Sequence, residues 1–258
     1  MKTIIISIIS AFILAFSGSL KAQKTIIHEP SGVKIIFPVD EAIFPSSWYS
    51  GRINGQYEPL DREEYERTEE LIISCLQKYP AAMLRNDLEI VYVVKTLEFY
   101  GAGYGGTNSN TDVYLTNKGL SRGYDNAYIE RVFHAEFSSI LLRKYEDYFD
   151  EEAWLACNDP EFEYGDGGVA ALKSNKSSED FDEELNKMGF INQYATSDME
   201  NDFNSFAKNM FLPRESFLEL VKTYPGIKKK SELLIEFYGK IHRFFDKEYF
   251  ENMEVSEE

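Results

Sequence analysis

The chain has 258 residues and a formal charge of −17, with 43% apolar and 15% aromatic side chains. This length fits one domain with a substantial core, or one domain and a small lobe. Phosphate-rich partners are bound by clustered Lys and Arg, so a chain this acidic is predicted to have no nucleic-acid partner.

The first 22 residues have the pattern of a secretory signal peptide. Lys2 precedes an apolar run at 4–16, and the segment 20–22, Leu-Lys-Ala, offers a cleavage site before Gln23. The run is shorter than the roughly 20 apolar residues of a membrane span, and no later segment reaches that length. We predict an exported periplasmic or cell-surface protein, cleaved near Ala22, that is not an integral membrane protein.

The two cysteines, Cys75 and Cys157, permit two interpretations. In an oxidising compartment they can pair, and a disulfide that closes so long a loop stabilises the fold by about 4 kcal/mol. Cys75 also stands among Ile72, Ile73 and Leu76, where a buried free thiol is equally natural. The sequence leaves the pairing open, and neither Cys belongs to a pattern with metal-ligand spacing.

The N-terminal part of the mature chain is predicted to be extended and then helical. Residues 23–60 are expected to form an extended arm or edge strand and a loop. A helix is predicted from Asp61, which can cap it, and Pro80 ends it. The apolar stripe of this helix places Cys75 on its buried side.

A strand, a glycine-rich turn and a second strand are predicted next. Residues 88–99 contain the β-branched and aromatic run Ile-Val-Tyr-Val-Val, which is typical of a strand. The segment 101–106 is rich in glycine but lacks the Lys-Ser/Thr of a phosphate-binding loop. It is predicted to be a flexible hairpin loop, with 112–116 as the returning strand.

The stretch 131–143 is predicted to be the central helix, capped by Asp125 or Asn126, with apolar side chains close to i, i+3, i+4 spacing. It also has the outline of the H-E-x-x-H helix of zinc peptidases, in which two His one turn apart hold zinc and the Glu is the general base. With Glu136 as that base, the ligand positions fall on Ala135 and Ser139, which are not normal zinc ligands.

His134 stands one residue before the first ligand position. One residue turns a side chain by about 100° around a helix of 3.6 residues per turn. The frame of a zinc helix is therefore present without its metal ligands, and His134 is predicted to be a hydrogen-bonded core or cleft residue.

The C-terminal half is predicted to be mostly helical. Ser197, with Glu200 three residues later, is expected to cap one of its helices. The polar segment 173–184 is the expected mobile insertion, and the acidic tail 251–258 is expected to fray. The predicted helices cover residues 150–157, 197–211, 214–222 and 228–246.

From Asp61 to Tyr238 the chain resembles a family of zinc-binding metallopeptidase-like proteins, gluzincin-like, that are exported in Gram-negative bacteria and often accompany outer-membrane nutrient import systems. The resemblance implies an α+β, zincin-like fold with a small mixed sheet packed on the active-site helix. The matching pieces, in family order, are the strand pair with its Gly-rich turn, 133–141, Trp154 to Asn158 with 162–165, 189–195, and 224–230.

The resemblance also implies a third zinc ligand, which would be the first Glu of a Glu-Asp-Phe-Ala-Glu pattern. That position holds Asn201 here, and Glu200 stands one residue early, as His134 does. All three ligand positions, Ala135, Ser139 and Asn201, are therefore substituted while Glu136 remains. Two residues in the matching segments, Tyr194 and Asp202, are the candidate binding residues.

Two functional hypotheses follow. In the first, residues 61–250 form a metallopeptidase-like domain with no cofactor that binds a peptide or glycan non-catalytically at the cell envelope, with an import system as a possible partner. In the second, the protein is an active zinc metallohydrolase whose atypical ligands are His134 and Glu200, with Glu136 or Asp202 completing the site.

Overall fold

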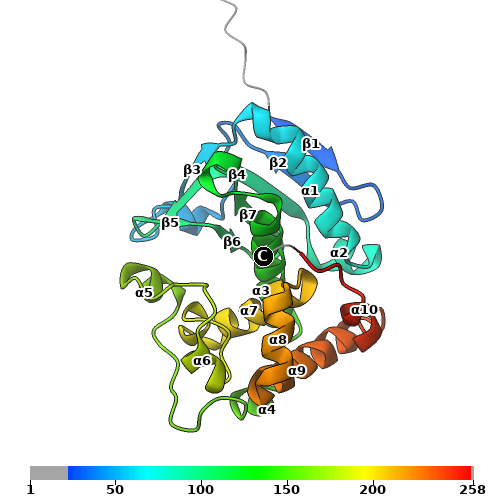
Figure 1. Cartoon of the computed structure of the whole chain (residues 1–258). Coiled ribbons are helices and arrows are strands. Elements are labelled where there is room, and N and C mark those ends of the chain that lie inside the picture. The colour runs from blue at the N-terminus through cyan, green and yellow to red at the C-terminus, as the bar shows by residue number, and fades with distance from the viewer. Residues whose placement is uncertain (1–22, 257–258) are drawn as a thin grey trace, which may run out of the picture.

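The computed structural model of the chain describes residues 23–256, so the predicted signal peptide lies outside the described residues. A sheet and a helical C-terminal half lie on two sides of helix α3 (Asn126–Lys144), as Figure 1 shows. The α+β class, with a mixed sheet beside the central helix, is the one that the sequence predicted. None of the described helices is long and apolar enough to cross a membrane.

Seven strands of the described chain form one mixed sheet. Five follow the order β1-β2-β4-β7-β6, and β3 and β5 pair with β4. Strands β2 and β7 run parallel to β4, and the other pairs are antiparallel. The segment 23–60, predicted as an extended arm or edge strand, supplies three of the seven. The strands are β1 (Lys24–Ile27), β2 (Lys34–Phe37), β3 (Gln56–Pro59), β4 (Ile90–Phe99), β5 (Ala102–Tyr104), β6 (Gly106–Asn108) and β7 (Asp112–Thr116).

A tight turn joins β4 to β5. Tyr100 and Gly101 have φ angles of 55° and 72°, and Phe99 pairs with Ala102, which is the geometry of a two-residue hairpin. The glycine-rich segment is thus a turn, but most of it is strand rather than a flexible loop. The chain reverses once here and once more between β6 and β7, so the returning strand β7 is parallel to β4.

The helices cover the sheet and then pack on one another. Helices α1 and α3 pack against one face of the sheet, α7 packs against α3, and α9 packs against α7 (Figure 1). The described helices are α1 (Tyr65–Gln77), α2 (Ala81–Asp87), α3, α4 (Glu151–Leu155), α5 (Gly168–Lys173), α6 (Glu183–Lys187), α7 (Met199–Phe211), α8 (Glu215–Thr223), α9 (Pro225–Ile241) and α10 (Lys247–Glu251).

Two of the three predicted helix caps are wrong. Asp125 caps α3 as predicted, because its Oδ1 accepts a hydrogen bond from the Tyr128 amide at 2.7 Å. Helix α7 is capped by Asp198, which accepts from the Asn201 amide at 2.6 Å, because the helix begins two residues later than predicted. Asp61 makes no capping bond, and its carboxylate pairs with Lys95 at 2.7 Å.

The chain beyond α10 is attached to the domain up to Ser256 rather than frayed. The Ser256 amide donates to the Pro213 carbonyl at 2.8 Å, and Arg131 Nη2 donates to Ser256 Oγ at 2.6 Å. Both cysteines are free thiols. Cys75 is fully buried on α1, and Cys157 is half-buried after α4, so the structure shows no disulfide.

The helical half encloses a buried ion pair. Lys230 on α9 and Asp202 on α7 are both completely buried, and Lys230 Nζ lies 2.6 Å from Asp202 Oδ2. The same oxygen accepts hydrogen bonds from the Trp154 indole at 2.9 Å and the Tyr164 hydroxyl at 2.7 Å. Lys230 also donates to the Gly189 carbonyl at 2.9 Å. The Asp202 carboxylate on α7 is thus bound by α4, by α9 and by the loop that contains Tyr164.

We expect Lys230→Met to lower the free energy of unfolding by about 3–5 kcal/mol, because it leaves the Asp202 carboxylate buried without a counter-charge. Lys229→Met is the matched control, since Lys229 is the preceding residue on the same helix and half of its side chain is exposed. Urea denaturation of both variants measures the difference. Equal stability of the two variants would show that the buried pair contributes little.

Candidate functional site

A polar cleft of about 730 Å³ lies between α3, α7, strand β6 and the segment 168–180. Strand β6 approaches α3 closely because Gly106 has no side chain. A Cβ there would lie 2.5 Å from Val132 Cγ1 and 3.0 Å from Glu136 Oε1. The glycine-rich segment therefore shapes one wall of the cleft rather than holding a phosphate.

Glu136 points from α3 into this cleft. Its Oε2 accepts a hydrogen bond from Asn108 Nδ2 at 2.6 Å. Burial raises the pKa of the Glu136 carboxyl to about 7, and the nearby Glu200 adds to the effect, whereas Asn108 and Arg143 oppose it. Near neutral pH this carboxyl group therefore exists partly in its protonated form, able to donate a hydrogen bond as well as to accept one.

An arginine links this carboxyl group to the next acid along the cleft. Arg143 donates to Asn108 Oδ1, and its Nη1 lies 2.8 Å from Glu200 Oε1. Both members of the Arg143–Glu200 pair are about 40% exposed. Glu200, a metal ligand under the second hypothesis, is thus engaged by a guanidinium at the rim of the cleft.

The three substituted ligand positions, Ala135, Ser139 and Asn201, line the same cleft as Glu136. The two polar ones are held by neighbouring side chains. Ser139 Oγ accepts from Asn204 Nδ2 at 2.6 Å, and Asn201 Nδ2 donates to Asp198 Oδ2 at 2.8 Å. The described residues that line the cleft include no His and no Cys, which are the preferred zinc ligands together with carboxylates.

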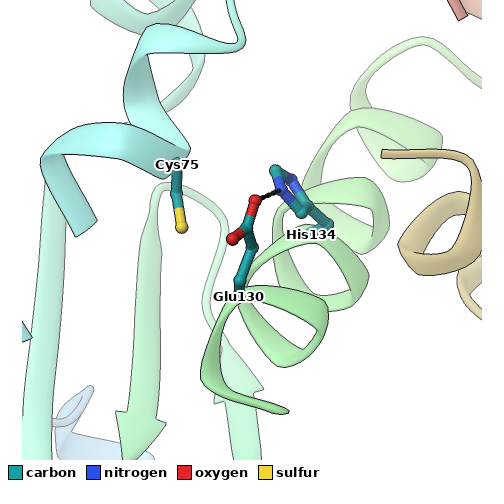
Figure 2. A group of neighbouring side chains, drawn as sticks. All are labelled: Cys75, Glu130 and His134. Carbon is teal, nitrogen blue, oxygen red and sulfur yellow. Dashed lines mark hydrogen bonds and ion pairs between the residues drawn. The ribbon is translucent and has the colours of Figure 1, made fainter. Parts of the chain in front are cut away.

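His134 lies on the other side of α3, in the core. Figure 2 shows it one turn from Glu130 and near Cys75 of α1. Its Nε2 lies 3.4 Å from Glu130 Oε1 and its Nδ1 lies 2.8 Å from the Tyr79 hydroxyl. Burial lowers the pKa of His134 to about 4, against the opposing effect of Glu130. The ring is therefore neutral, with Nε2 donating to Glu130 and Nδ1 accepting from Tyr79.

Cys75, Glu130 and His134 offer ligand atoms within 4.8 Å of one another, a donor set that zinc accepts. Their present partners oppose metal binding. Lys78 Nζ lies 2.6 Å from Glu130 Oε1. Burial acts to raise the pKa of Glu130, but His134 and Lys78 outweigh it and lower that pKa to about 2. Burial also raises the pKa of the Cys75 thiol. A metal would have to displace the lysine, remove the thiol proton and change the tautomer of the His134 ring, so the group fits a closed hydrogen-bonded network better.

The structure separates the remaining candidate residues. Tyr194 lines the cleft, and burial raises the pKa of its hydroxyl. Asp202 does not line the cleft and is buried against Lys230. His134 and Glu200, which the second hypothesis combines in one metal site, lie on different sides of α3. Glu200 reaches the cleft from α7, whereas His134 faces the core because one residue along α3 turns a side chain by about 100° from the direction of Ala135.

Sequence reasoning did not identify several side chains that line the cleft. Asn108 holds Glu136, and Arg131, Lys208 and Arg214 form its basic part. No local pattern marks these residues, because they come from separate elements that only the tertiary fold brings together.

We expect Glu136→Gln to stabilise the fold above pH 7 by about 1–2 kcal/mol relative to the natural chain. The folded-state pKa of Glu136 is raised to about 7 from 4.5. Between pH 4.5 and about 7, the folded protein therefore keeps a proton on Glu136 that the unfolded chain has lost. The free energy of unfolding of the natural chain falls as the pH rises through this range. Gln keeps an acceptor for Asn108 without a buried charge.

Urea denaturation at pH 4 and pH 8.5 measures this effect. The gain should vanish at the lower pH, where both states are protonated. Glu236→Gln, an exposed position on α9, is the control and should show no such pH dependence. A pH-independent difference for Glu136→Gln would rule out a raised pKa.

Comparisons with known proteins support the fold alone. No protein-family model matches the chain, and no curated protein matches it. Among solved structures, it is similar to a crystal structure described as a "putative zinc-binding metallo-peptidase" from Bacteroides caccae ATCC 43185. The TM-score is 0.50 at 14% sequence identity, over 84% of this chain and 79% of that chain. The chain therefore has a metallopeptidase-like fold.

Proposed function

We propose that this protein is a non-catalytic binding protein of the cell envelope, built on a metallopeptidase-like fold whose zinc site has been lost. One observation carries the proposal. Glu136, in the position of the general base, lies in the cleft beside Ala135, Ser139 and Asn201, none of which offers an imidazole or a carboxylate.

Zinc hydrolysis requires about three protein ligands that converge on one point and leave a position for water. Among the described residues, no three acids that line the cleft bring their carboxylate oxygens close enough together to hold a metal ion. Glu200 is paired with Arg143, and Glu179 lies 2.7 Å from Lys208 Nζ. Asp198 caps α7. The second hypothesis further requires His134 to leave the core, where Tyr79 and Glu130 hold its ring.

The cleft suits a polar ligand of peptide or glycan type. Three tyrosines, Tyr104, Tyr128 and Tyr194, line it and offer ring faces and hydroxyl groups. Strand β6 is the last strand in the sheet order. Its outer edge can pair with an extended peptide by adding a strand. These features serve binding without any chemical step.

We expect the purified mature protein to contain no stoichiometric zinc, by mass spectrometry of the metal, after incubation with zinc salts. The variant Ala135→His, Ser139→His, Asn201→Glu restores the ligand set around Glu136 and should bind about one zinc ion per chain and melt at a higher temperature. This variant tests whether the cleft keeps the zincin frame.

Control substitutions show which residues hold any zinc that binds to the natural chain. Zinc in the natural chain that His134→Ala and Cys75→Ala both abolish would locate a metal in the core group. Zinc that both His134→Ala and Glu200→Gln abolish, and that Cys75→Ala leaves in place, would favour the metallohydrolase. That second result would contradict the proposed loss of the metal site, and peptide hydrolysis would then be assayed.

The proposed location at the envelope rests on the N-terminal sequence pattern alone. We expect the protein expressed with its own N-terminus in a Gram-negative bacterium to be recovered outside the cytoplasm and to begin at Gln23, by intact mass and N-terminal sequencing. A retained Met1 in the cytoplasmic fraction would contradict export. Recovery with an outer-membrane import complex would support the proposed partner.

A further inference from the structure

Cations gather in one part of the cleft, although the whole chain carries a charge of −17. Arg131 on α3, Lys208 on α7 and Arg214 just before α8 all line it. Burial lowers the pKa of Arg131, and the nearby positive charge of Arg214 lowers it further. Arg131 is distant in sequence from Lys208 and Arg214, and the fold brings the three like charges together inside a partly buried space, which is unfavourable without nearby anions.

Only one of these three cations forms an ion pair among the described residues, although six acids line the cleft. Lys208 pairs with Glu179 at 2.7 Å, and the pKa of Glu179 is held low by Lys208 first and then by the two arginines. Neither arginine forms an ion pair within the described range 23–256. Arg131 donates to Ser256 Oγ, and the Arg214 guanidinium lies 4.5 Å from the centre of the Phe181 ring.

Both guanidinium groups also keep unused donors. The Nε atoms of Arg131 and Arg214 are buried and have no hydrogen-bond partner among the residues that the structure describes. Buried polar atoms in folded proteins are nearly always paired, so unpaired ones need an explanation. Both arginines also line the cleft, so an anionic ligand group in this part of it would supply the missing counter-charge.

Building on the proposed binding function, we propose that Arg131, Lys208 and Arg214 form a basic subsite that binds a carboxylate group of the ligand. Guanidinium groups match a carboxylate in geometry, with two parallel N–H···O bonds from each fork. The Arg214 guanidinium lies over the Phe181 ring. The part of the cleft around Glu136 and Tyr194 remains for the uncharged portion of the ligand.

A carboxylate can come from the C-terminus of a peptide, from an acidic sugar, or from the chain itself. Glu257 and Glu258 follow Ser256 in the sequence and lie outside the described residues. The competing explanation is that the arginines pair with these two acids of the chain itself. The test must separate such pairing from ligand binding.

In the experiment, the full mature chain is titrated with two matched pairs of probes. Binding is measured by the changes in the NMR chemical shifts of the backbone amides. One pair is N-acetyl-trialanine with a free carboxylate and the same peptide as its C-terminal amide. The other is glucuronic acid and glucose. The variants are Arg131→Gln with Arg214→Gln, and Arg243→Gln as an exposed control that does not line the cleft. Glu257→Gln with Glu258→Gln tests the tail.

We expect at least one acidic probe to bind about tenfold more tightly than its uncharged partner, and the double arginine variant to remove this preference. The control should keep the preference, and the tail variant should keep or strengthen it. Preference within the peptide pair alone identifies a peptide terminus, and preference within the sugar pair alone identifies an acidic glycan.

Equal binding of acidic and uncharged probes, or no binding of any probe, would overturn the subsite. A second result would also overturn it: the tail variant and the double arginine variant lose the same thermal stability, and neither changes probe binding. The arginines would then pair with the acids of the tail and not with a ligand. None of these results decides the proposed loss of zinc, which the metal measurements test separately.

Discussion

The two faces of helix α3 determine the chemistry of this molecule. Successive residues of an α-helix differ by about 100° in direction, so His134 and Glu136 point into different surroundings. His134 joins a dry network with Tyr79 and Glu130, and Glu136 enters the polar cleft. A zinc site needs side chains that converge from the same face. Moving a histidine by one position along this helix therefore converts a potential ligand into a core residue.

Unpaired buried polar groups gather along the cleft. In the core, one oxygen of the Asp202 carboxylate has a lysine, an indole and a tyrosine as partners, although its other oxygen has none in the described chain. Of the nine buried side-chain atoms without a partner in the described chain, five belong to residues that line the cleft. Orphaned groups cost stability, and their gathering at one surface fits a site that a polar ligand completes.

The sequence was sufficient where structure depends on near neighbours. The strand at 90–99 and the central helix with its Asp125 cap follow from periodicity and capping within a few residues. Other features depend on distant partners. Asp202 was a candidate binding residue because nothing near it in sequence shows that Lys230 neutralises it. The proposed basic subsite unites Arg131 on α3 with Arg214 just before α8. The parallel direction of β7 depends on the short strands between it and β4.

Under the proposed loss of the zinc site, Glu136 illustrates how a retained residue takes on different chemistry. A zinc ion beside a carboxylate favours the ionised form, as any neighbouring positive charge does. Without such an ion, burial dominates and raises the pKa of Glu136 to about 7. A carboxyl group of this kind exchanges its proton near neutral pH and meets a ligand either as donor or as acceptor. The proposed function therefore assigns to Glu136 the role of a polar contact in a binding cleft, in place of a base that activates water.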